Sequence, residues 1–209
     1  QESRGLGDVY KRQQYDVSLR ETQTYEIIDD VAHMKSEIGL LYYNDFNRPV
    51  LEKLIHTNEL TFTELFTAHP HIFIGKTHPL ANKDVVSMDE LEEYPYISFE
   101  QGDHNSFYFS EEIFSTVVRP KHIRVRDRAS LFSLLLGLDG YTVSSGVIDK
   151  EVNGENIISV PLAEEGLMHI GYITNNKMQR SRLGQEYIQA LEQYVGNYLS
   201  LIHISEPTR

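Results

Sequence analysis

The chain has 209 residues, of which 40% are hydrophobic and 11% aromatic, a composition that suits a folded globular protein of one domain or two small lobes. Its formal net charge of −12 argues against a nucleic-acid-binding surface, because an acidic surface repels phosphate groups. The absence of cysteine excludes disulfides, thiolate metal sites and a cysteine nucleophile, and no run of about eighteen apolar residues points to a membrane span.

The two ends of the chain are related to each other through their codons. The codons of residues 3–13, read backwards on the opposite strand, encode residues 199–209 without a break. An inverted copy of this kind resembles the adapter of a transposon-based sequencing library that has been translated together with the protein. We therefore expect 1–13 and 199–209 to be adapter sequence, and the natural protein to be a fragment within 14–198 whose own termini are lost.

The remaining sequence alternates apolar runs with helical periods, which is typical of an α/β protein. It begins with a predicted strand at 14–19, a helix that Thr24 caps, and a buried strand at 37–43. This strand–helix–strand order predicts two parallel strands. Two more strands follow at 61–66 and 71–76.

A second group of elements follows a proline-marked turn. Its first elements are expected to be a short helix from Ser87 to Glu93, a strand at 94–100, a helix that begins near Asn105 and a strand at 122–126. A helix over 127–140 and a strand at 141–147 come next, followed by a helical turn to Val152. The chain then forms strands at 156–162 and 167–174 and ends with a helix from about Ser181 to near Tyr198.

These elements fall into two clusters, which predicts a particular path for the chain. The simplest path leaves a first lobe, builds a second and returns, so that 14–76 and 161–198 form lobe I and 77–160 form lobe II. The fold class is therefore α/β, with two Rossmann-like lobes joined by two crossover segments. Folds with two crossings place a ligand cleft between the lobes, at the carboxyl ends of the strands.

The first candidate binding segment lies where the strand at 94–100 gives way to the next helix. Gly102 gives the backbone freedom to approach a ligand, and Gln101, Asn105 and Ser106 offer neutral polar groups beside the free N–H groups of a helix start. Glu100, at the end of the strand, is a candidate carboxylate for the same site.

The second candidate segment begins the helix over 127–140. Asp127 is a plausible N-cap, and Arg128 and Ser130 follow on the first turn, where they would hold a small carboxylate-bearing ligand. The alternative is that both segments are ordinary helix caps, and that Glu100 and Asp127 form salt bridges with Arg126 or Arg128.

Other polar clusters carry less chemistry. His69, His71 and His78 would need further ligands to bind zinc, so a structural or surface role is favoured and no metal site is expected. The Ser-Ser-Gly at 144–146 lacks the leading glycine of a nucleophile elbow, so its hydroxyls are expected to satisfy the backbone at a strand end.

Adjacent acidic pairs such as Glu111 and Glu112 point in different directions on a helix, and we expect them to be solvated. No convergent set of acid and base residues is present, so no catalytic residue is assigned and an enzyme is the weakest alternative. No cofactor-binding motif occurs either.

The order of these motifs resembles that of a known family. The segments that carry the resemblance are RETQTYEIIDDV with SEIGLLY, HIFIGKTHPLA, SMDELEEYPYISFEQG, IRVRDRASLFSLLLGLDGYTVSSGVI, IISVPL and MHIGYIT. Together, from Tyr15 to Tyr198, they resemble the effector-binding region of LysR-type transcriptional regulators. The stretches from Glu100 to Ile113 and from Asp127 to Gly146 are most similar to regulators of sulfur amino-acid metabolism.

This resemblance implies a fold like that of periplasmic solute-binding proteins, with crossings near 71–76 and 159–162. A small effector, anionic or amino-acid-like, would bind between the lobes of a cytoplasmic homodimer or homotetramer and change its grip on DNA. The family's cleft positions add Asn44 to Gln101, Gly102, Asn105, Ser106, Arg128 and Ser130. The alternative with the same fold is a solute-binding protein of a transport system.

The resemblance also predicts what the fragment lacks. DNA contact would require a helix-turn-helix domain ahead of it, and lobe I would be short of its first strand and helix. Because a missing internal strand leaves backbone groups unpaired, we expect the chain to be poorly stable or prone to aggregate.

Overall fold

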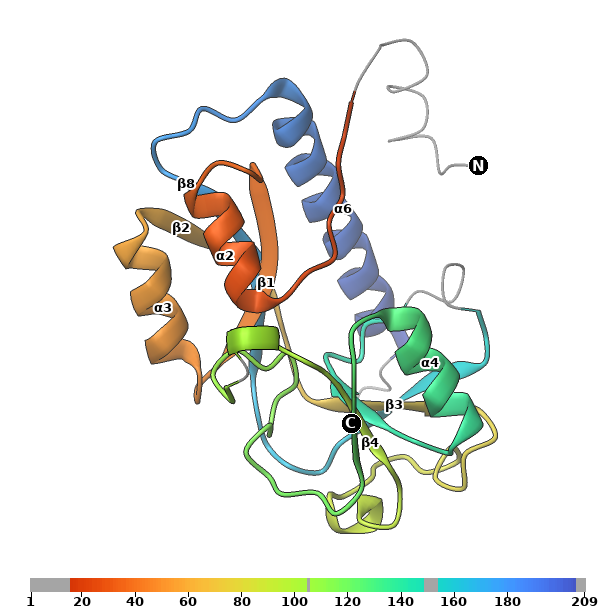
Figure 1. The fold of residues 1–209 in the computed structure, drawn as a ribbon. Helices are drawn as coiled ribbons and strands as arrows, with labels where there is room; N and C mark the ends of the chain where they lie inside the picture. Colours follow the sequence, from red (N-terminus) through yellow and green to blue (C-terminus); the bar gives the residue numbers. More distant parts are fainter. Residues whose placement is uncertain (1–15, 105, 149–153, 206–209) are drawn as a thin grey trace.

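The computed structural model describes residues 16–104, 106–148 and 154–205. Figure 1 shows two sheets, each with helices packed on it, that lie in two lobes. The chain leaves the first lobe after β2 (Leu60–Ala68) and returns to it with β8 (Met168–Asn175). The predicted α/β fold with two lobes and two crossings is confirmed.

The first sheet has the strand order β1-β8-β2, where β1 is Ile38–Asn44. The last strand in the sequence lies in its middle and is antiparallel to both neighbours. One face of this sheet carries α2 (Thr24–Ala32) and α3 (Arg48–Thr57), since residues of both helices share a core with the strands. That core consists of Ile28, Val31, Leu41, Tyr43, Leu51, Ile55, Leu60 and Ile173.

The opposite face of the first sheet carries the long helix α6 (Arg182–Ser205), drawn in blue in Figure 1. Successive side chains of a strand point to opposite faces. On β8, Ile173 therefore faces α2 and α3, while Tyr172 lines a space together with Ile188 of α6.

The second sheet has five strands in two hydrogen-bonded groups. The first is β6 (Thr142–Ser144), β3 (His71–Gly75) and β7 (Ile157–Pro161), with β3 antiparallel to both neighbours; the second is the parallel pair β4 (Tyr96–Phe99) and β5 (His122–Val125). A single bridge between Tyr96 and Tyr141 joins the groups next to β6.

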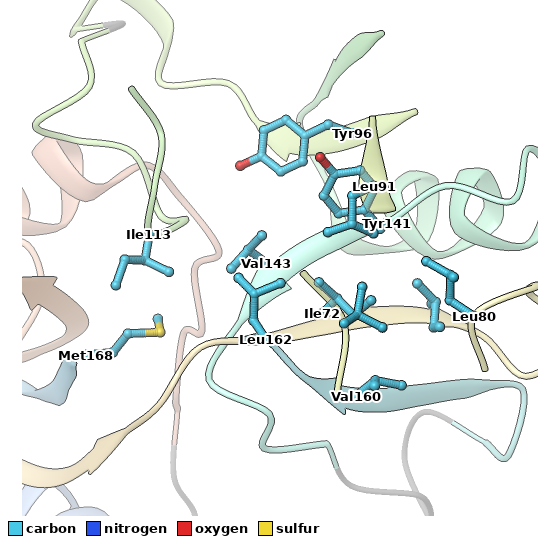
Figure 2. Close-up of a cluster of buried hydrophobic side chains, with 12 residues drawn as sticks. Ile72, Leu80, Leu91, Tyr96, Ile113, Tyr141, Val143, Val160, Leu162 and Met168 are labelled. Carbon is cyan, nitrogen blue, oxygen red and sulfur yellow. The ribbon is translucent and has the colours of Figure 1, made fainter. Parts of the chain in front are cut away.

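Two cores lie on the two faces of this second sheet. Phe73 of β3 packs with residues of α4 (Arg128–Gly137), including Leu131 and Leu135. Ile72 and its neighbours on the other face form a core that also reaches the first lobe, and we call this the interlobe core. Its members are Ile72, Ile74, Leu80, Val86, Leu91, Tyr96, Ile113, Tyr141, Val143, Val160, Leu162 and Met168 (Figure 2).

The strand predicted at 14–19 is wrong for the residues described. Residues 16–19 lie outside both sheets, and Val17 and Leu19 are 63% and 88% exposed; residues 14 and 15 lie outside the described ranges. The predicted parallel pair is wrong too, because β1 is hydrogen-bonded to β8 alone and is antiparallel to it. A strand needs a neighbour to take its backbone hydrogen bonds, and none of the described strands offers one here.

The helix predicted to begin near Asn105 is also wrong. Asn105 itself lies outside the described residues, and 106–119 form turns rather than an α-helix. Phe114 has a φ of +61°, which no right-handed helix accepts. Tyr108 stacks instead on Phe46 of the first lobe, with ring centroids 5.1 Å apart, so contacts across the lobes outweigh the helical period.

Other elements agree with the sequence or extend it. The helix from Thr24 and the strand at 37–43 are confirmed, although the N-cap residue is Gln23 and its side chain makes no cap. The helix predicted from Ser87 to Glu93 is a 3₁₀ turn, η1 (Asp89–Leu91). The turn predicted to end at Val152 lies largely outside the described residues.

One helix was not predicted from the sequence, and another is longer than predicted. The patterns assign no helix to 48–57, where α3 buries Leu51 and Ile55 one turn apart behind a proline in its first turn. The predicted end of the last helix near Tyr198 is wrong, since α6 continues to Ser205. The sequence between Arg182 and Ser205 contains no proline, the residue that most strongly breaks a helix.

The division into lobes stays a prediction at its boundaries. In the structure β3 pairs with β6 and β7, so the change from one sheet to the other falls between Ala68 and His71. The predicted boundary at 76 falls at the far end of β3. The second crossing lies between Leu162 and Met168, close to the predicted one.

Candidate functional site

The start of α2 makes a buried polar contact between the two lobes. The backbone N–H of Thr24 donates to Oε1 of Gln101 at 3.2 Å, and Gln101 is 1% exposed. Nε2 of Gln101 donates in turn to Oε1 of Glu111 at 3.4 Å. We call this group the α2 junction; it comprises Gln23 and Thr24 from the first lobe and Gln101, Gly102 and Glu111 from the second.

Two observations favour glycine at position 102 of the α2 junction. Its φ is +54°, in the left-handed region that favours glycine. A Cβ at this position would also lie 2.6 Å from Oε1 of Gln23. Gly102 opens the short 3₁₀ helix η2 (Gly102–His104), which Figure 1 shows beside the start of α2.

An aromatic contact closes the same junction. The rings of Tyr25 and His104 stack with centroids 3.5 Å apart, and Phe109 meets Tyr25 edge to face at 5.6 Å. The first turn of α2 is thus covered by side chains of the second lobe. A ligand that reaches the N–H groups of this turn has to displace Gln101 or move the lobes apart.

The charges around the α2 junction are mixed. Burial raises the pKa of Glu111, Gln101 and Arg128 lower it, and Glu21 raises it further. Nε of Arg128 lies 3.9 Å from Oε1 of Glu21, and both side chains are largely exposed. The structure therefore brings Gln101, Gly102 and Arg128, three predicted binding residues, to one place.

Asp127 and Ser130 satisfy each other at the start of α4. Oδ1 of Asp127 accepts the backbone N–H of Ser130 at 2.8 Å, and Oδ2 accepts its hydroxyl at 2.8 Å. These bonds hold the pKa of Asp127 below its usual range, the bond from the Ser130 N–H having the largest effect. Both residues form an ordinary N-cap, as the alternative interpretation expected.

The other predicted site residues are engaged elsewhere. Asn44 is buried, and its Oδ1 accepts the N–H groups of Phe46 and Asn47 in the turn after β1. Glu100 forms an ion pair with Arg126, the salt bridge that the sequence offered as an alternative.

Ser106 lies just beyond the α2 junction and shows a local role. Its hydroxyl accepts the N–H of Tyr108 at 3.2 Å. Asn105, its neighbour in the predicted site, lies outside the described residues.

Sequence reasoning missed three parts of the α2 junction: Gln23, the backbone of Thr24 and Glu111. The expectation that Glu111 and Glu112 are solvated is wrong, because Glu112 is 3% exposed and Glu111 is mostly covered. No helix forms there, so neither carboxyl is carried out to solvent. The pattern Glu-Glu-Ile-Phe, with two acids directly before buried apolar residues, was the signal available.

A cavity of about 590 Å³ lies elsewhere, between β8 and α6. Tyr172 and Ile188 form its apolar part, while Arg180, Gln185 and Glu192 give it a polar rim. Its volume is that of a small-molecule pocket, but none of the predicted binding residues lines it. It competes with the α2 junction as a place for a ligand.

The histidines and serines set apart above have structural partners. His78 is buried, with Nε2 near the carbonyl of Asp139 and Nδ1 accepting the N–H of Leu80. The hydroxyl of Ser145 accepts the N–H of Val147 at 3.4 Å at the end of β6, as predicted.

Metal clusters and membrane-spanning helices are both absent from the part of the chain that the structure describes. Within it, no cluster of three or more His, Cys, Asp and Glu residues could hold a metal ion. Likewise, no helix formed by the described residues combines the length and apolarity needed to cross a membrane.

Comparison with known proteins gives one family. A model described as the LysR substrate binding domain matches residues 11–196. No curated protein matches the chain.

Solved structures resemble this fold at low identity. HinK, a LysR family transcriptional regulator from Pseudomonas aeruginosa, is 15% identical with a TM-score of 0.57, over 86% of this chain and 59% of that one. The effector binding domain of QuiR in complex with shikimate is 17% identical with a TM-score of 0.56, over 84% and 79%.

The C-terminal domain of a probable LysR family regulator from Rhodococcus sp. RHA1 is 16% identical with a TM-score of 0.56, over 87% and 84%. At these identities the likeness concerns the fold. The chain spans 59% of the length of the first of these structures.

Proposed function

Because the chain belongs to the family of LysR substrate-binding domains, we propose that it senses a small effector molecule at the α2 junction and passes the signal to a transcription factor. The contact that carries this proposal is the hydrogen bond from Thr24 to Gln101, which joins the two lobes at a helix N-terminus. The first N–H groups of a helix attract negative charge.

The effector that suits this place is a small carboxylate or amino acid. Its carboxylate would take the Thr24 N–H now bonded to Gln101 and would lie within reach of Arg128. The ammonium group of an amino acid would be attracted to Glu21 and Glu111, the carboxyl groups near the α2 junction. Gly102 lets the backbone approach such a ligand closely. We keep sulfur-containing amino acids within this class.

The signal would be a change in the arrangement of the lobes. A ligand shifts an equilibrium between two arrangements only by the difference of its affinities for them. If a ligand displaces Gln101, the hydrogen bond between Thr24 and Gln101, which joins the lobes in the observed arrangement, is replaced by bonds to the ligand. In a dimer or tetramer attached to a DNA-binding domain, the same shift would alter DNA contact.

The predicted alternative, a solute-binding protein of a transport system, is not favoured by the family match. The family is one of transcriptional regulators rather than enzymes. We propose a cytoplasmic location on the same ground.

A thermal-shift screen tests the effector class. The probes are L-cysteine, L-methionine, L-serine, shikimate and citrate, each titrated against the whole chain. A binding probe raises the melting temperature in proportion to the logarithm of its concentration above Kd. If none of these carboxylates moves the melting temperature at millimolar concentration, the proposed class is wrong.

The variant Arg128→Ala tests the place of binding. Loss of a charged hydrogen-bond partner should weaken a hit by about ten- to a hundredfold, measured by calorimetry. Arg182→Ala is the matched control, since Arg182 is about as exposed and pairs with Glu186 far from the α2 junction. Gln185→Ala reports on the cavity between β8 and α6; weaker binding in this variant alone would move the site there.

A further inference from the structure

Glu112 is a carboxyl group buried inside the protein. It is 3% exposed, and its Oε1 accepts the backbone N–H of Phe99, the last residue of β4, at 2.8 Å. Its Oε2 has no hydrogen-bond partner among the described residues. A carboxylate with one bonded oxygen costs more free energy to bury than the neutral acid, because an unpaired charge is harder to remove from water than an unpaired polar group.

The segment around Glu112 belongs to the interlobe core. Ile113 and Met168 of β8 are both members of this core, and Figure 2 shows them facing each other across the lobes. The hydroxyl of Tyr42 on β1 donates to the carbonyl of Ser110 at 3.5 Å. Tyr96 of β4 turns its hydroxyl toward the side where Ile113 and Met168 lie (Figure 2).

Few charges face Glu112 in this core. Glu111 repels a charge on it and Arg119 attracts one, but burial has the larger effect and raises the pKa of Glu112 to about 8. The guanidinium of Arg119 lies over the ring of Tyr96, 3.9 Å from its centroid, and donates to the carbonyl of Phe114.

Tyr42 and Tyr96, the two tyrosines near Glu112, also have raised pKa values. Burial first, and Glu112 second, raise the pKa of Tyr42 and Tyr96 well above the usual value. Both hydroxyls therefore stay protonated and uncharged near neutral pH, so neither adds a negative charge beside Glu112.

We propose that Glu112 is a proton-dependent brace, whose neutral carboxyl keeps the 110–113 segment in the interlobe core and whose ionisation releases it and weakens the α2 junction. Phe99, which Glu112 holds, lies two residues before Gln101. Glu111, the neighbour of Glu112, holds the side chain of Gln101. Movement of this one segment therefore disturbs both supports of the bond between Gln101 and Thr24.

The proposed role of Glu112 rests on the proposed function in one respect, which is that the proposed function places Gln101 at the effector site. Its experiment uses no ligand, so its failure would leave effector binding untouched. Conversely, a chain that binds none of the screened probes would still show the proton linkage described next.

The linkage between protonation and folding follows from the raised pKa. The neutral acid is favoured in the folded chain, so its contribution to stability is complete below about pH 4.5 and is lost as pH rises to about 8. Between these limits, unfolding releases one proton from Glu112. The unfolding equilibrium constant should therefore rise about tenfold per pH unit from this group.

Denaturant unfolding of the whole chain between pH 5 and 9 tests this, with Glu112→Gln and Glu93→Gln. Glu112→Gln should remove that tenfold dependence, because a glutamine amide does not titrate. Glu93→Gln is the matched control, since the side chain of Glu93 is 89% exposed, and it should keep the dependence. Amide hydrogen exchange should show Thr24 losing protection above about pH 8 in the parent chain but not in Glu112→Gln.

A measurement on Glu111→Gln keeps the proposal open to refutation if Glu112→Gln does not fold. Infrared spectra of Glu111→Gln should show the carbonyl stretch of a protonated carboxylic acid at pH 6.5 and its loss near pH 8. Absence of that band, or equal pH dependence of Glu112→Gln and Glu93→Gln, overturns the proposal.

Discussion

The starts of α2 and α4 are capped in different ways, although both follow extended backbone in a two-lobed fold. The first turn of α4 is capped within four residues, since Asp127 takes both the N–H and the hydroxyl of Ser130. The start of α2 has no side-chain cap of its own, and the Thr24 N–H is satisfied by Gln101 from the other lobe. A cap from the same helix survives movement of the lobes, whereas a cap from the opposite lobe does not.

This difference separates candidate residues that remain available to a ligand from those that already cap their own helix. The two candidate binding segments of the second lobe are equally good by sequence, yet the one that begins α4 has its polar groups bonded to each other. At α2 the N–H depends on a side chain that a ligand carboxylate could replace. Three variants sharpen or break this comparison.

Replacement of Gly102 by Val should have the largest effect. A β-branched residue at a φ of +54° is strained, and its Cβ would press on Gln23. We expect a loss of about 2 kcal/mol, which lowers the melting temperature of a chain of this size by about 4–8 °C.

Gly137→Ala is the control for Gly102→Val in the same scan. Apart from its chain neighbours and the backbone of its own helix, no atom lies within 4 Å of a Cβ at Gly137, the last residue of α4, and its φ is not positive. Alanine there should leave the melting temperature unchanged or raise it slightly. A melting temperature for Gly102→Val equal to that of the parent would mean that the α2 junction is not closed in solution.

Replacement of Asp127 by Ala should have an intermediate effect. It removes the cap of α4, and loss of such a cap lowers the melting temperature by about 2–4 °C. Because the cap is local, hydrogen exchange should speed up in the first turn of α4 and stay unchanged at Thr24. Faster exchange at Thr24 in Asp127→Ala would show that the two helix starts are coupled after all.

Replacement of Gln101 by Ala should change global stability least. The Thr24 N–H loses its partner, but water reaches it once the contact opens, so the melting temperature should fall by less than about 2 °C. Exchange at Thr24 should become about fivefold faster, while α4 keeps its protection. Unchanged exchange at Thr24 would remove Gln101 from the role of cap.

The sequence was sufficient for the elements with strong periodicity or clear end signals. The helix predicted over 127–140 is observed as the shorter α4 (Arg128–Gly137), and it follows from its leucine spacing and its Asp127 cap, both of which are local. The buried strands predicted at 156–162 and 167–174, which are β7 and β8 in the structure, follow from continuous apolar runs. Their place in a two-lobed α/β fold follows from their order along the chain.

The sequence was insufficient where a distant contact decides the local structure. Residues 106–119 read as a helix, but Tyr108 finds a partner on Phe46 of the other lobe. Glu112 reads as solvated, but its carboxyl is bonded to Phe99 thirteen positions back. Gln101 was identified as a binding residue without its partner, because nothing near Thr24 indicates what would cap it.

The position of β8 has a consequence for how the chain is made. β8 lies between β1 and β2, which share no hydrogen bonds with each other, so the first sheet cannot form until residues 168–175 have left the ribosome. The strands of the second sheet all lie between His71 and Pro161 and can pair earlier. During synthesis the sheet of the first lobe therefore forms after that of the second, and β1 and β2 stay unpaired until β8 has been made.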